Sequence, residues 1–372
     1  MAISLSMLLC VCGLSVVCGF NKVSGVVRES VHQVIGHAGS SGYLPESTKE
    51  GYDLAGYMLA DYSEPDLVLT GDGHFIAMHD LTLEGTTNVE SFPEYKNRIS
   101  TFVIEGEPIT GYYAINFTLS EVKGLRVRQR HDSRSNLYNW LFQIPTLADI
   151  ISWQLDHYST TGRLVGLYPE LKHPDWYNLM GFPMEDMLLR NLEDAGYHIN
   201  DPNTPSNLTN VVPVAIQCFK NTSLRYLAER TKIPLVQLMG ISNEQPDPAK
   251  VYTQEVLDEI ATYAQAVAPD KKLFTEDWGV VPQQAVKMRQ WATERNLLFV
   301  PWSFQVEDMY IPSQFAGDHE MELKFFYGCL QSSGLFHEFP DHARQVAEMC
   351  RAHDGPKGNC LELCPYKSLL KL

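Results

Sequence analysis

The sequence has little positive charge. Its 29 Lys and Arg residues stand against 45 Asp and Glu residues, which gives a formal net charge of −16 over 372 residues. No long basic block interrupts this excess, so broad electrostatic binding to nucleic acid or to an anionic membrane is excluded as the main function. An acidic protein that handles a phosphate needs positive charge placed locally, from a metal ion or from one or two basic side chains.

Long apolar runs are also scarce. The N-terminal residues 1–19 carry no charged side chain, and 7–18 forms an apolar run that ends in small residues. The run is shorter than the roughly 20 residues that span a bilayer, which favours a secretory signal peptide over a membrane anchor. The lack of a basic residue before it is atypical. No other stretch is long enough to span a membrane, so we expect a secreted, extracellular protein of 44% hydrophobic composition with a substantial core.

In a secreted protein, sequons can be glycosylated and cysteines can form disulfides. Asn-x-Ser/Thr sequons predict N-glycosylation at Asn116, Asn207 and Asn221. Cleavage of the signal leaves five cysteines, three of them in a predicted C-terminal tail over 348–372: Cys218, Cys329, Cys350, Cys360 and Cys364. An oxidising compartment favours at least one disulfide, joining Cys360 or Cys364 to Cys350 or to Cys329. Zinc-finger spacing is missing, and Cys218 lies in an apolar run and is expected to be buried.

Two common catalytic signatures are absent. There is no Gly-x-Ser-x-Gly motif, which excludes the usual serine-hydrolase elbow, and the Gly39–Gly42 segment has no Walker lysine, which makes it a poor nucleotide site.

Short apolar runs alternate with amphipathic helical patterns through the body of the chain. The predicted strands cover 34–37, 65–70, 75–79, 164–171, 211–219, 234–239, 297–304 and 334–339, with one more within 264–274. The predicted helices cover 45–59, 146–157, 184–195, 222–230, 253–267, 283–295 and 321–332. This alternation indicates an α/β fold with parallel strands, either a closed barrel or a doubly wound sheet. Residues 88–143 break the rhythm and are predicted to be a large insertion after an early strand.

Polar residues gather where the predicted strands end, the place where α/β folds carry their chemistry. Glu64 and Asp66 are two apart on an extended chain, so both side chains face the same way and can hold one cation. Glu170 follows from another strand, and three carboxylates without a soft ligand suit Mg²⁺ or Ca²⁺. His37 and His79 add a general acid and a general base, and Lys172 adds a charge for an anionic oxygen. The set suits cleavage of a phosphodiester.

These residues carry a resemblance to a known family. The segments His37-Ala-Gly, Leu44-Pro-Glu-Ser-Thr, 60–70, His79-Asp80, 168–172 and 334–340 resemble, in order, the motifs of the glycerophosphodiester phosphodiesterases, above all their larger periplasmic and extracellular type. The similarity extends over about 34–347, almost the whole predicted mature chain.

The resemblance implies a single TIM-type (β/α)₈ barrel over residues 20–347, with its site at the carboxyl ends of the strands. It implies hydrolysis of a small-molecule glycerophosphodiester to sn-glycerol 3-phosphate and an alcohol, a step of glycerol and phospholipid metabolism. Matched by position, His37 and His79 are the acid/base pair, and Lys172 contacts the phosphate. The metal ligands for Ca²⁺ or Mg²⁺ are Glu64, Asp66 and Glu170. In the family a neighbouring glycerol hydroxyl is often proposed to attack the phosphorus.

The chain departs from the family at one position, where Ala38 replaces the arginine of the His-Arg-Gly motif. A guanidinium there would donate two hydrogen bonds to the phosphate, and its loss removes on the order of 2–5 kcal/mol of transition-state stabilisation. Three explanations stay open: an arginine of the insertion (Arg126, Arg128 or Arg130) takes its place, the substrate is a different phosphodiester or phospholipid, or the barrel is a non-hydrolytic extracellular binding or structural protein. Trp302 and Phe304 are candidates for an apolar wall that binds a choline-like head group.

Overall fold

The computed structural model describes residues 32–200, 213–241, 247–354, 360–366 and 368. The predicted signal peptide and the Asn207 sequon lie outside these residues. Within the described part of the chain, no helix combines the length and the apolar character that crossing a membrane requires.

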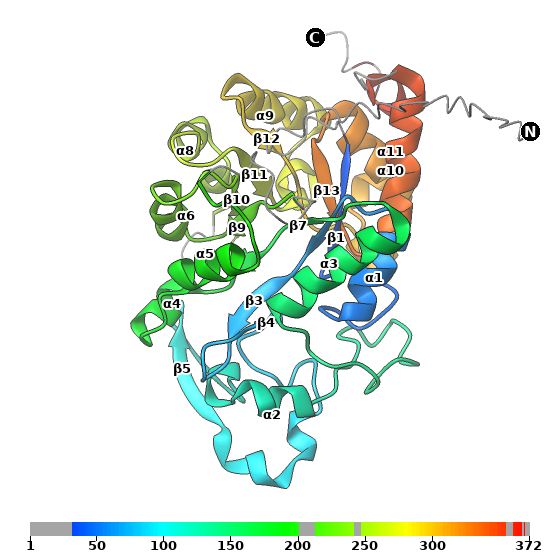
Figure 1. Ribbon diagram of the computed structural model, residues 1–372. Helices are drawn as coiled ribbons and strands as arrows, with labels where there is room; N and C mark the ends of the chain where they lie inside the picture. Colours follow the sequence, from blue (N-terminus) through cyan, green and yellow to red (C-terminus); the bar gives the residue numbers. More distant parts are fainter. Residues whose placement is uncertain (1–31, 201–212, 242–246, 355–359, 367, 369–372) are drawn as a thin grey trace, which may run out of the picture.

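Parallel strands form the centre of the fold (Figure 1). One hydrogen-bonded sheet runs in the order β13 (Gly334–His337), β1 (Gln33–His37), β2 (Tyr62–Glu64) and β7 (Gly166–Leu167). The parallel part of the other contains β12 (Leu298–Phe299), β11 (Ala266–Pro269), β10 (Leu235–Met239), β9 (Ile216–Cys218), β8 (Glu170–Leu171) and β3 (Asp66–Leu69).

The two sheets are halves of one closed barrel. β2 and β3 form one strand position interrupted at Pro65, and β7 and β8 form another interrupted at Pro169, because proline has no N–H for the ladder. Between the last two strands, Phe304 N–H donates to the carbonyl of Phe336 at 2.8 Å and Ser333 N–H donates to that of Phe299 at 2.8 Å. The described strands thus occupy eight positions around a barrel, which confirms the predicted fold class.

A helix follows each strand position and covers the outside of the barrel (Figure 1). These are α1 (Lys49–Tyr57), α3 (Leu147–Thr161), α5 (Met184–Asp194), α6 (Asn221–Ala228), α8 (Gln254–Ile260), α9 (Pro282–Glu294), α10 (His319–Lys324) and α11 (Pro340–Asp354). Short helices α2 (Leu119–Gly124), α4 (Pro174–Leu179) and α7 (Pro248–Val251) lie in the loops, and the π-helix η8 (Phe325–Cys329) continues α10. α11 runs beyond residue 347, where the sequence analysis ended the barrel, so the tail begins only after this helix.

Alternating side chains divide the core into two layers. One residue or more from every strand position joins a cluster that fills the barrel, including Ile35, Tyr62, Val236 and Phe336. Their neighbours along the strands, such as Val34, pack outward into the larger cluster beneath the helices. This two-sided burial is why the strands are apolar throughout instead of alternating with polar residues.

The run predicted as a strand over 75–79 is not part of the barrel. β4 (Phe75–Ala77) pairs antiparallel with β3, whereas the sequence analysis treated it as one of the parallel strands. The connection from Leu69 to Phe75 is too short for the crossover that a parallel pair requires, so the chain turns back as a hairpin.

The chain leaves the barrel between β4 and α3, a stretch that contains the predicted insertion over 88–143. It forms the 3₁₀ turns η1 (Val89–Ser91), η2 (Pro93–Arg98) and η3 (Ala114–Asn116), together with α2 and a hairpin of β5 (Ser100–Ile104) and β6 (Glu107–Gly111). The hairpin turn has φ of +50° at Glu105 and +87° at Gly106, as a two-residue hairpin turn requires. Figure 1 shows this excursion projecting from one end of the barrel.

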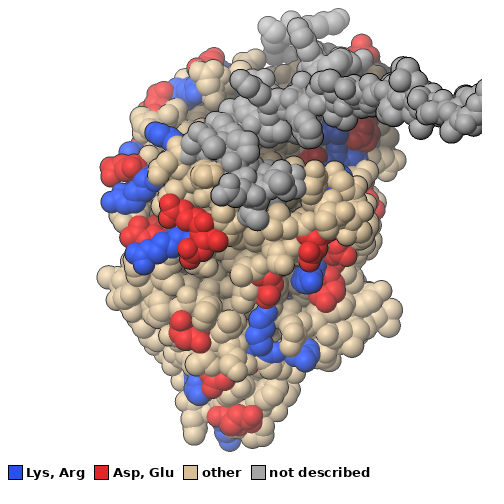
Figure 2. All heavy atoms as spheres, viewed as in Figure 1, with Lys and Arg blue, Asp and Glu red and all other residues tan. Residues whose placement is uncertain are grey.

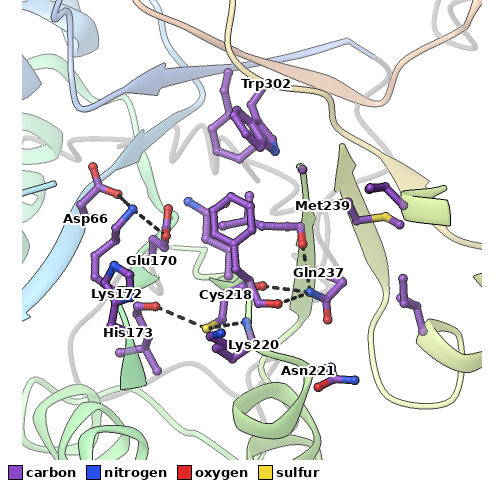
Figure 3. A pocket seen from close by; sticks show the side chains of 18 of the residues that line it. Asp66, Glu170, Lys172, His173, Cys218, Lys220, Asn221, Gln237, Met239 and Trp302 are labelled. Atoms are coloured by element: carbon purple, nitrogen blue, oxygen red, sulfur yellow. Dashed lines mark hydrogen bonds and ion pairs between the residues drawn. The ribbon is translucent and has the colours of Figure 1, made fainter. Parts of the chain in front are cut away.

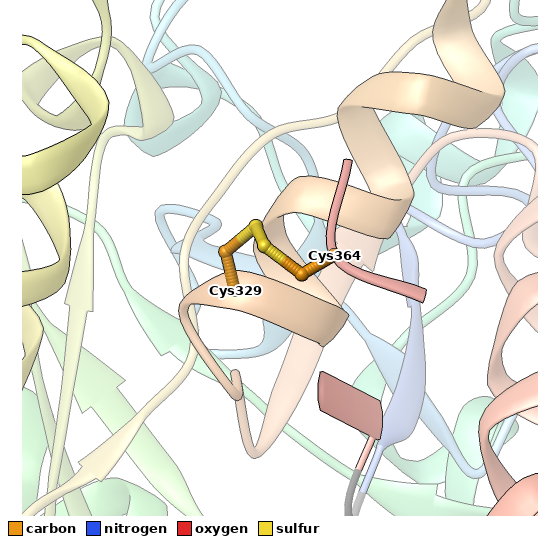
Figure 4. Close-up of a disulfide and its surroundings, with 2 residues drawn as sticks. All are labelled: Cys329 and Cys364. Atoms are coloured by element: carbon orange, nitrogen blue, oxygen red, sulfur yellow. A yellow bond between two sulfur atoms is a disulfide. The ribbon is translucent and has the colours of Figure 1, made fainter. Parts of the chain in front are cut away.

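Two disulfides hold the C-terminal segment. Cys329 of η8 pairs with Cys364 (Figure 4), and Cys350 of α11 pairs with Cys360. The predicted disulfide bonding of the tail is confirmed, and Cys218 is buried and unpaired, as expected. Closing loops of 35 and 10 residues in this way removes conformational entropy from the unfolded chain.

Candidate active site

Three buried carboxylates lie together at the strand ends. Glu64 ends β2, Asp66 begins β3 and Glu170 begins β8, and Asp66 and Glu170 are partners in the parallel register. One oxygen from each lies within 4.8 Å of the other two, and each residue is at most 6% exposed. The structure therefore brings together the three carboxylates that the sequence analysis selected from separate strands.

The local charge balance fits a divalent cation. Lys172 Nζ lies 2.9 Å from a Glu170 oxygen and 3.5 Å from Asp66 Oδ1, which neutralises one of the three carboxylates. Burial and the charge of Asp66 raise the pKa of Glu64 well above its usual range. Burial, opposed by Lys172, raises the pKa of Glu170 to about 7. Asp66 Oδ2 is buried without a hydrogen-bond partner among the described residues. An all-oxygen donor set with excess negative charge suits Mg²⁺ or Ca²⁺.

His37 ends β1 beside the carboxylate of Glu338, which follows β13. Its Nδ1 lies 3.5 Å from Glu338 Oε1, and the two side chains are 25% and 6% exposed. Burial alone would lower the pKa of His37, but Glu338 and the charges of Glu64 and Asp66 raise it to about 9. The carboxylates therefore favour the protonated form of His37, and Nε2 is the ring nitrogen not directed at Glu338.

His79 follows β4 and is the more exposed of the two histidines. Its Nδ1 lies 2.7 Å from Asp80 Oδ1, and its side chain is 48% exposed. Arg130 contacts the other oxygen of Asp80 at 2.8 Å and Glu46 at 2.7 Å. Burial would raise the pKa of Asp80, but His79 and Arg130 lower it well below its usual range.

Both histidines share one arrangement: a carboxylate on Nδ1, and an arginine of the insertion on that carboxylate. For His37 the arginine is Arg134, whose side chain is 3% exposed and lies 2.5 Å from Glu338 and 2.6 Å from Glu307. Sequence reasoning missed Glu338 and Arg134. Glu338 stands at the end of a predicted strand, where α/β folds carry their chemistry, and this position could have identified it. No local signal marks Arg134.

The three arginines considered as replacements at position 38 do not line the pocket among the described residues. Arg126 donates to carbonyls at the end of α2, including that of Leu125 at 2.7 Å, and Arg130 is held by Glu46 and Asp80. Ala38 itself is 5% exposed, has φ of +49°, and donates its N–H to Glu64 at 2.8 Å. The backbone of Ala38 helps to position the carboxylate of Glu64, but its methyl side chain has neither a charge nor a hydrogen-bond donor for an anion.

The site opens into a cavity of about 660 Å³, lined by both histidines, the three carboxylates and Lys172. Trp302, a predicted substrate-binding residue, lies on the wall of this cavity (Figure 3). Phe304 does not: it is fully buried in the cluster beneath the helices, against Phe326 and His337.

The tip of the insertion hairpin reaches the same cavity. Glu105 lies 3.1 Å from Lys220 Nζ and 3.6 Å from His173 Nδ1, and all three line the pocket. The hairpin signal was present in the sequence, because Glu105-Gly106 separates two runs of strand-forming residues. What the sequence did not indicate was that this turn folds back onto the barrel.

Comparison with known proteins gives one consistent result. The sequence model of the glycerophosphoryl diester phosphodiesterase family matches residues 37–324. A glycerophosphodiester phosphodiesterase of Arabidopsis thaliana is 30% identical over 85% of this chain and 86% of its own length. A glycerophosphodiester phosphodiesterase of Haemophilus influenzae is 33% identical over 44% of this chain and 46% of its own.

Solved structures share the fold. A phosphodiesterase from Oleispira antarctica, determined with the product sn-glycerol-3-phosphate, superposes with a TM-score of 0.55 and 19% identity over 86% of this chain and 97% of its own. A glycerophosphoryl diester phosphodiesterase from Parabacteroides distasonis gives a TM-score of 0.54 and 15% identity, covering 90% and 92% of the two chains.

Proposed function

The chain belongs to the glycerophosphoryl diester phosphodiesterase family and is an enzyme of that class, and from this premise we propose that it hydrolyses glycerophosphodiesters to sn-glycerol 3-phosphate and an alcohol with a divalent cation. The observation that carries the proposal is the meeting of three buried carboxylates, a lysine and two carboxylate-paired histidines in one cavity. The Oleispira antarctica phosphodiesterase, which shares the fold, was determined with this product bound.

The carboxylates and Lys172 prepare the site for the phosphate. Glu64, Asp66 and Glu170 would hold Mg²⁺ or Ca²⁺, which supplies a Lewis acid for the non-bridging oxygens. Gln217 donates to Glu64 at 2.9 Å, and the Ala38 N–H donates to its other oxygen, so Glu64 is fixed in place. Lys172 lies against two of the carboxylates and presents a cation to the anionic substrate.

The histidines move the protons. We assign His79 as the base that accepts the proton of the attacking glycerol hydroxyl, whose oxygen forms the new bond to phosphorus. We assign His37, kept protonated by Glu338, as the acid that donates a proton to the departing alkoxide as its bond to phosphorus breaks. Water then opens the cyclic phosphate with the two roles reversed.

The direct test is incubation of purified protein with glycerophosphocholine and glycerophosphoethanolamine, with Mg²⁺ or Ca²⁺ and with a chelator. The proposal expects glycerol 3-phosphate to be released and the chelator to stop the release. If the protein binds cation but cleaves no diester, the barrel is a binding or structural protein, an outcome that Ala38 would then explain.

Arg134→Ala is expected to lower kcat/KM roughly tenfold, because a misplaced acid/base group loses part of its contribution of about 10²- to 10⁴-fold. Without the guanidinium, the charge of Glu338 is less compensated, so the pKa of His37 rises and the alkaline limb of the pH profile moves to higher pH. Arg134→Lys, which keeps the charge, should return the limb toward its original position. If the rate falls by the same factor at every pH and the alkaline limb of the pH profile does not move, Arg134 has only a structural role.

Ala38→Arg is expected to raise kcat/KM on a simple glycerophosphodiester by about 10², since His37, the carboxylates and Lys172 are in place to use a two-pronged phosphate contact. Ala38→Gln, of comparable length but without charge, is the control and should give no such gain. Flat or falling activity in the arginine variant would mean that another cation already serves the phosphate.

We also propose that the protein is secreted. Two disulfides in the C-terminal segment support an oxidising compartment. Of the described sequons, Asn221 is exposed, whereas the Asn116 amide is half-buried and donates to Ser100 Oγ at 2.8 Å, so Asn221 is the better acceptor. N-terminal sequencing of protein collected from the medium should begin at Gly19 or Phe20, and an intact Met1 would contradict a cleaved signal.

A further inference from the structure

The active-site cavity extends well beyond the groups that the phosphate needs. Figure 3 shows Asp66, Glu170 and Lys172 on one side of the pocket, with Met239 on the opposite side. That opposite side is formed by the ends of β9 and β10, by α7 and α8, and by the loop after β12. A volume of about 660 Å³ falls within the range of about 300–1,000 Å³ that is typical of drug-sized ligands.

This second side of the pocket is lined by apolar side chains. Its wall is built from six apolar side chains, which we call the apolar wall: Phe219, Met239, Val251, Val256, Ile260 and Trp302. The rings of Phe219 and Trp302 meet edge to face with centroids 5.6 Å apart.

The polar groups beside the apolar wall already have protein partners, although Gln237 and Tyr263 also line the cavity. Gln237 donates to the carbonyls of Phe219 at 2.8 Å and Leu238 at 2.9 Å, and accepts from the Tyr263 hydroxyl at 2.8 Å. Trp302 Nε1 donates to the carbonyl of Ala268 at 2.6 Å. A polar ligand group placed here would lose its water without gaining a hydrogen bond, whereas a hydrocarbon chain would lose nothing.

The charged residues at the rim are likewise committed to protein partners. Glu259 is paired with Arg225 at 2.6 Å, and Lys250 lies 3.6 Å from Asp247. The cavity therefore has a charged half that suits a phosphate and an apolar half that suits a chain of methylene groups.

We propose that the apolar wall binds a hydrocarbon chain carried by the substrate, so that acyl- or alkyl-bearing glycerophosphodiesters are preferred over those with a small polar alcohol. The inference rests on the proposed phosphodiesterase function and names the substrate class of the same site. The chain can be carried by the glycerol, as in a lysophospholipid, or by the leaving alcohol. Each methylene group that is buried raises kcat/KM about fourfold.

The test compares three diesters on the purified full chain: glycerophosphocholine, 1-octanoyl-glycerophosphocholine and glycerophospho-octanol, below the concentrations at which they form micelles. We expect at least one of the chain-bearing diesters to exceed glycerophosphocholine in kcat/KM by about 10², which corresponds to three or four buried methylene groups at about fourfold each. The diester that does so identifies which end carries the chain. Values within threefold of one another for all three would overturn the inference and leave the proposed function standing.

A variant pair ties the preference to the wall. Val256→Phe fills the cavity and should reduce the ratio of kcat/KM between the preferred chain-bearing diester and glycerophosphocholine about tenfold. Val281→Phe places the same substitution at a half-exposed valine outside the pocket and should leave that ratio and the activity unchanged. An unaltered ratio in Val256→Phe would remove the wall from chain recognition.

Binding measurements separate the two proposals if no diester is cleaved, an outcome that defeats the proposed function alone. Octyl phosphate should then bind at least 30-fold more tightly than inorganic phosphate by calorimetry, and Val256→Phe should reduce that difference. Equal affinities of the two phosphates would overturn the inference as well.

Discussion

Replacing His37 or His79 by alanine is expected to lower kcat by about 10² or more while the fold stays intact. We expect the fold to tolerate both changes, because both rings line the cavity and that of His79 is half exposed. Rates on a glycerophosphodiester and thermal melting of each variant provide the measurement. His198→Ala, at an exposed position away from the pocket, is the matched control and should behave as the wild type.

The two histidine variants should differ on an activated substrate. When the alcohol of the diester is p-nitrophenol, it leaves as p-nitrophenolate without needing a proton. The loss of rate in His37→Ala should therefore largely disappear on this diester. The loss in His79→Ala should persist, because the attacking hydroxyl must still give up its proton. The reverse pattern would exchange the two roles, and activity within a few-fold of the wild type in either variant would remove that histidine from the mechanism.

Removing the cation or one of its carboxylates should have an effect of similar size. The wild-type protein is expected to melt a few degrees higher with saturating Mg²⁺ or Ca²⁺, because an ion that binds only the folded state stabilises it by mass action and relieves repulsion among three buried carboxylates. Glu64→Gln keeps the shape and one of the two hydrogen bonds that Glu64 accepts, but it removes a charge. It should therefore abolish the shift and lower kcat by about 10² or more.

The control for this variant is Glu94→Gln, which neutralises an exposed glutamate of the insertion and should retain the cation-dependent shift. The control matters because the chain carries a net charge of −16 and divalent ions bind acidic surfaces weakly. Figure 2 shows acidic and basic side chains interspersed over the visible face, and no large patch of this face is acidic alone. An unchanged shift in Glu64→Gln would place the cation somewhere else.

Some of the site followed from sequence because its spacing is local. Glu64 and Asp66 face the same way on an extended chain whatever surrounds them, and Lys172 stands in the same relation to Glu170. The strand and helix pattern was equally local: Thr146 begins α3 through a capping box with Asp149. The antiparallel turn of β4 was missed because an apolar run of three residues looks the same in either strand direction.

The sequence by itself determined the α/β class and the groups that carry the chemistry, because period and residue types act over a few positions. The choice of a closed barrel over a doubly wound sheet came from the resemblance to the family. Only the tertiary structure decided how those groups are tuned. Glu338 meets His37 because β13 closes the barrel against β1, and Arg134 reaches Glu338 because the insertion folds back over the strand ends. The apolar wall likewise exists only where β9, β10 and α8 converge. The two contacts of Glu338 join residues hundreds of positions apart. Their pairing depends on chain closure and packing, which local propensity does not determine.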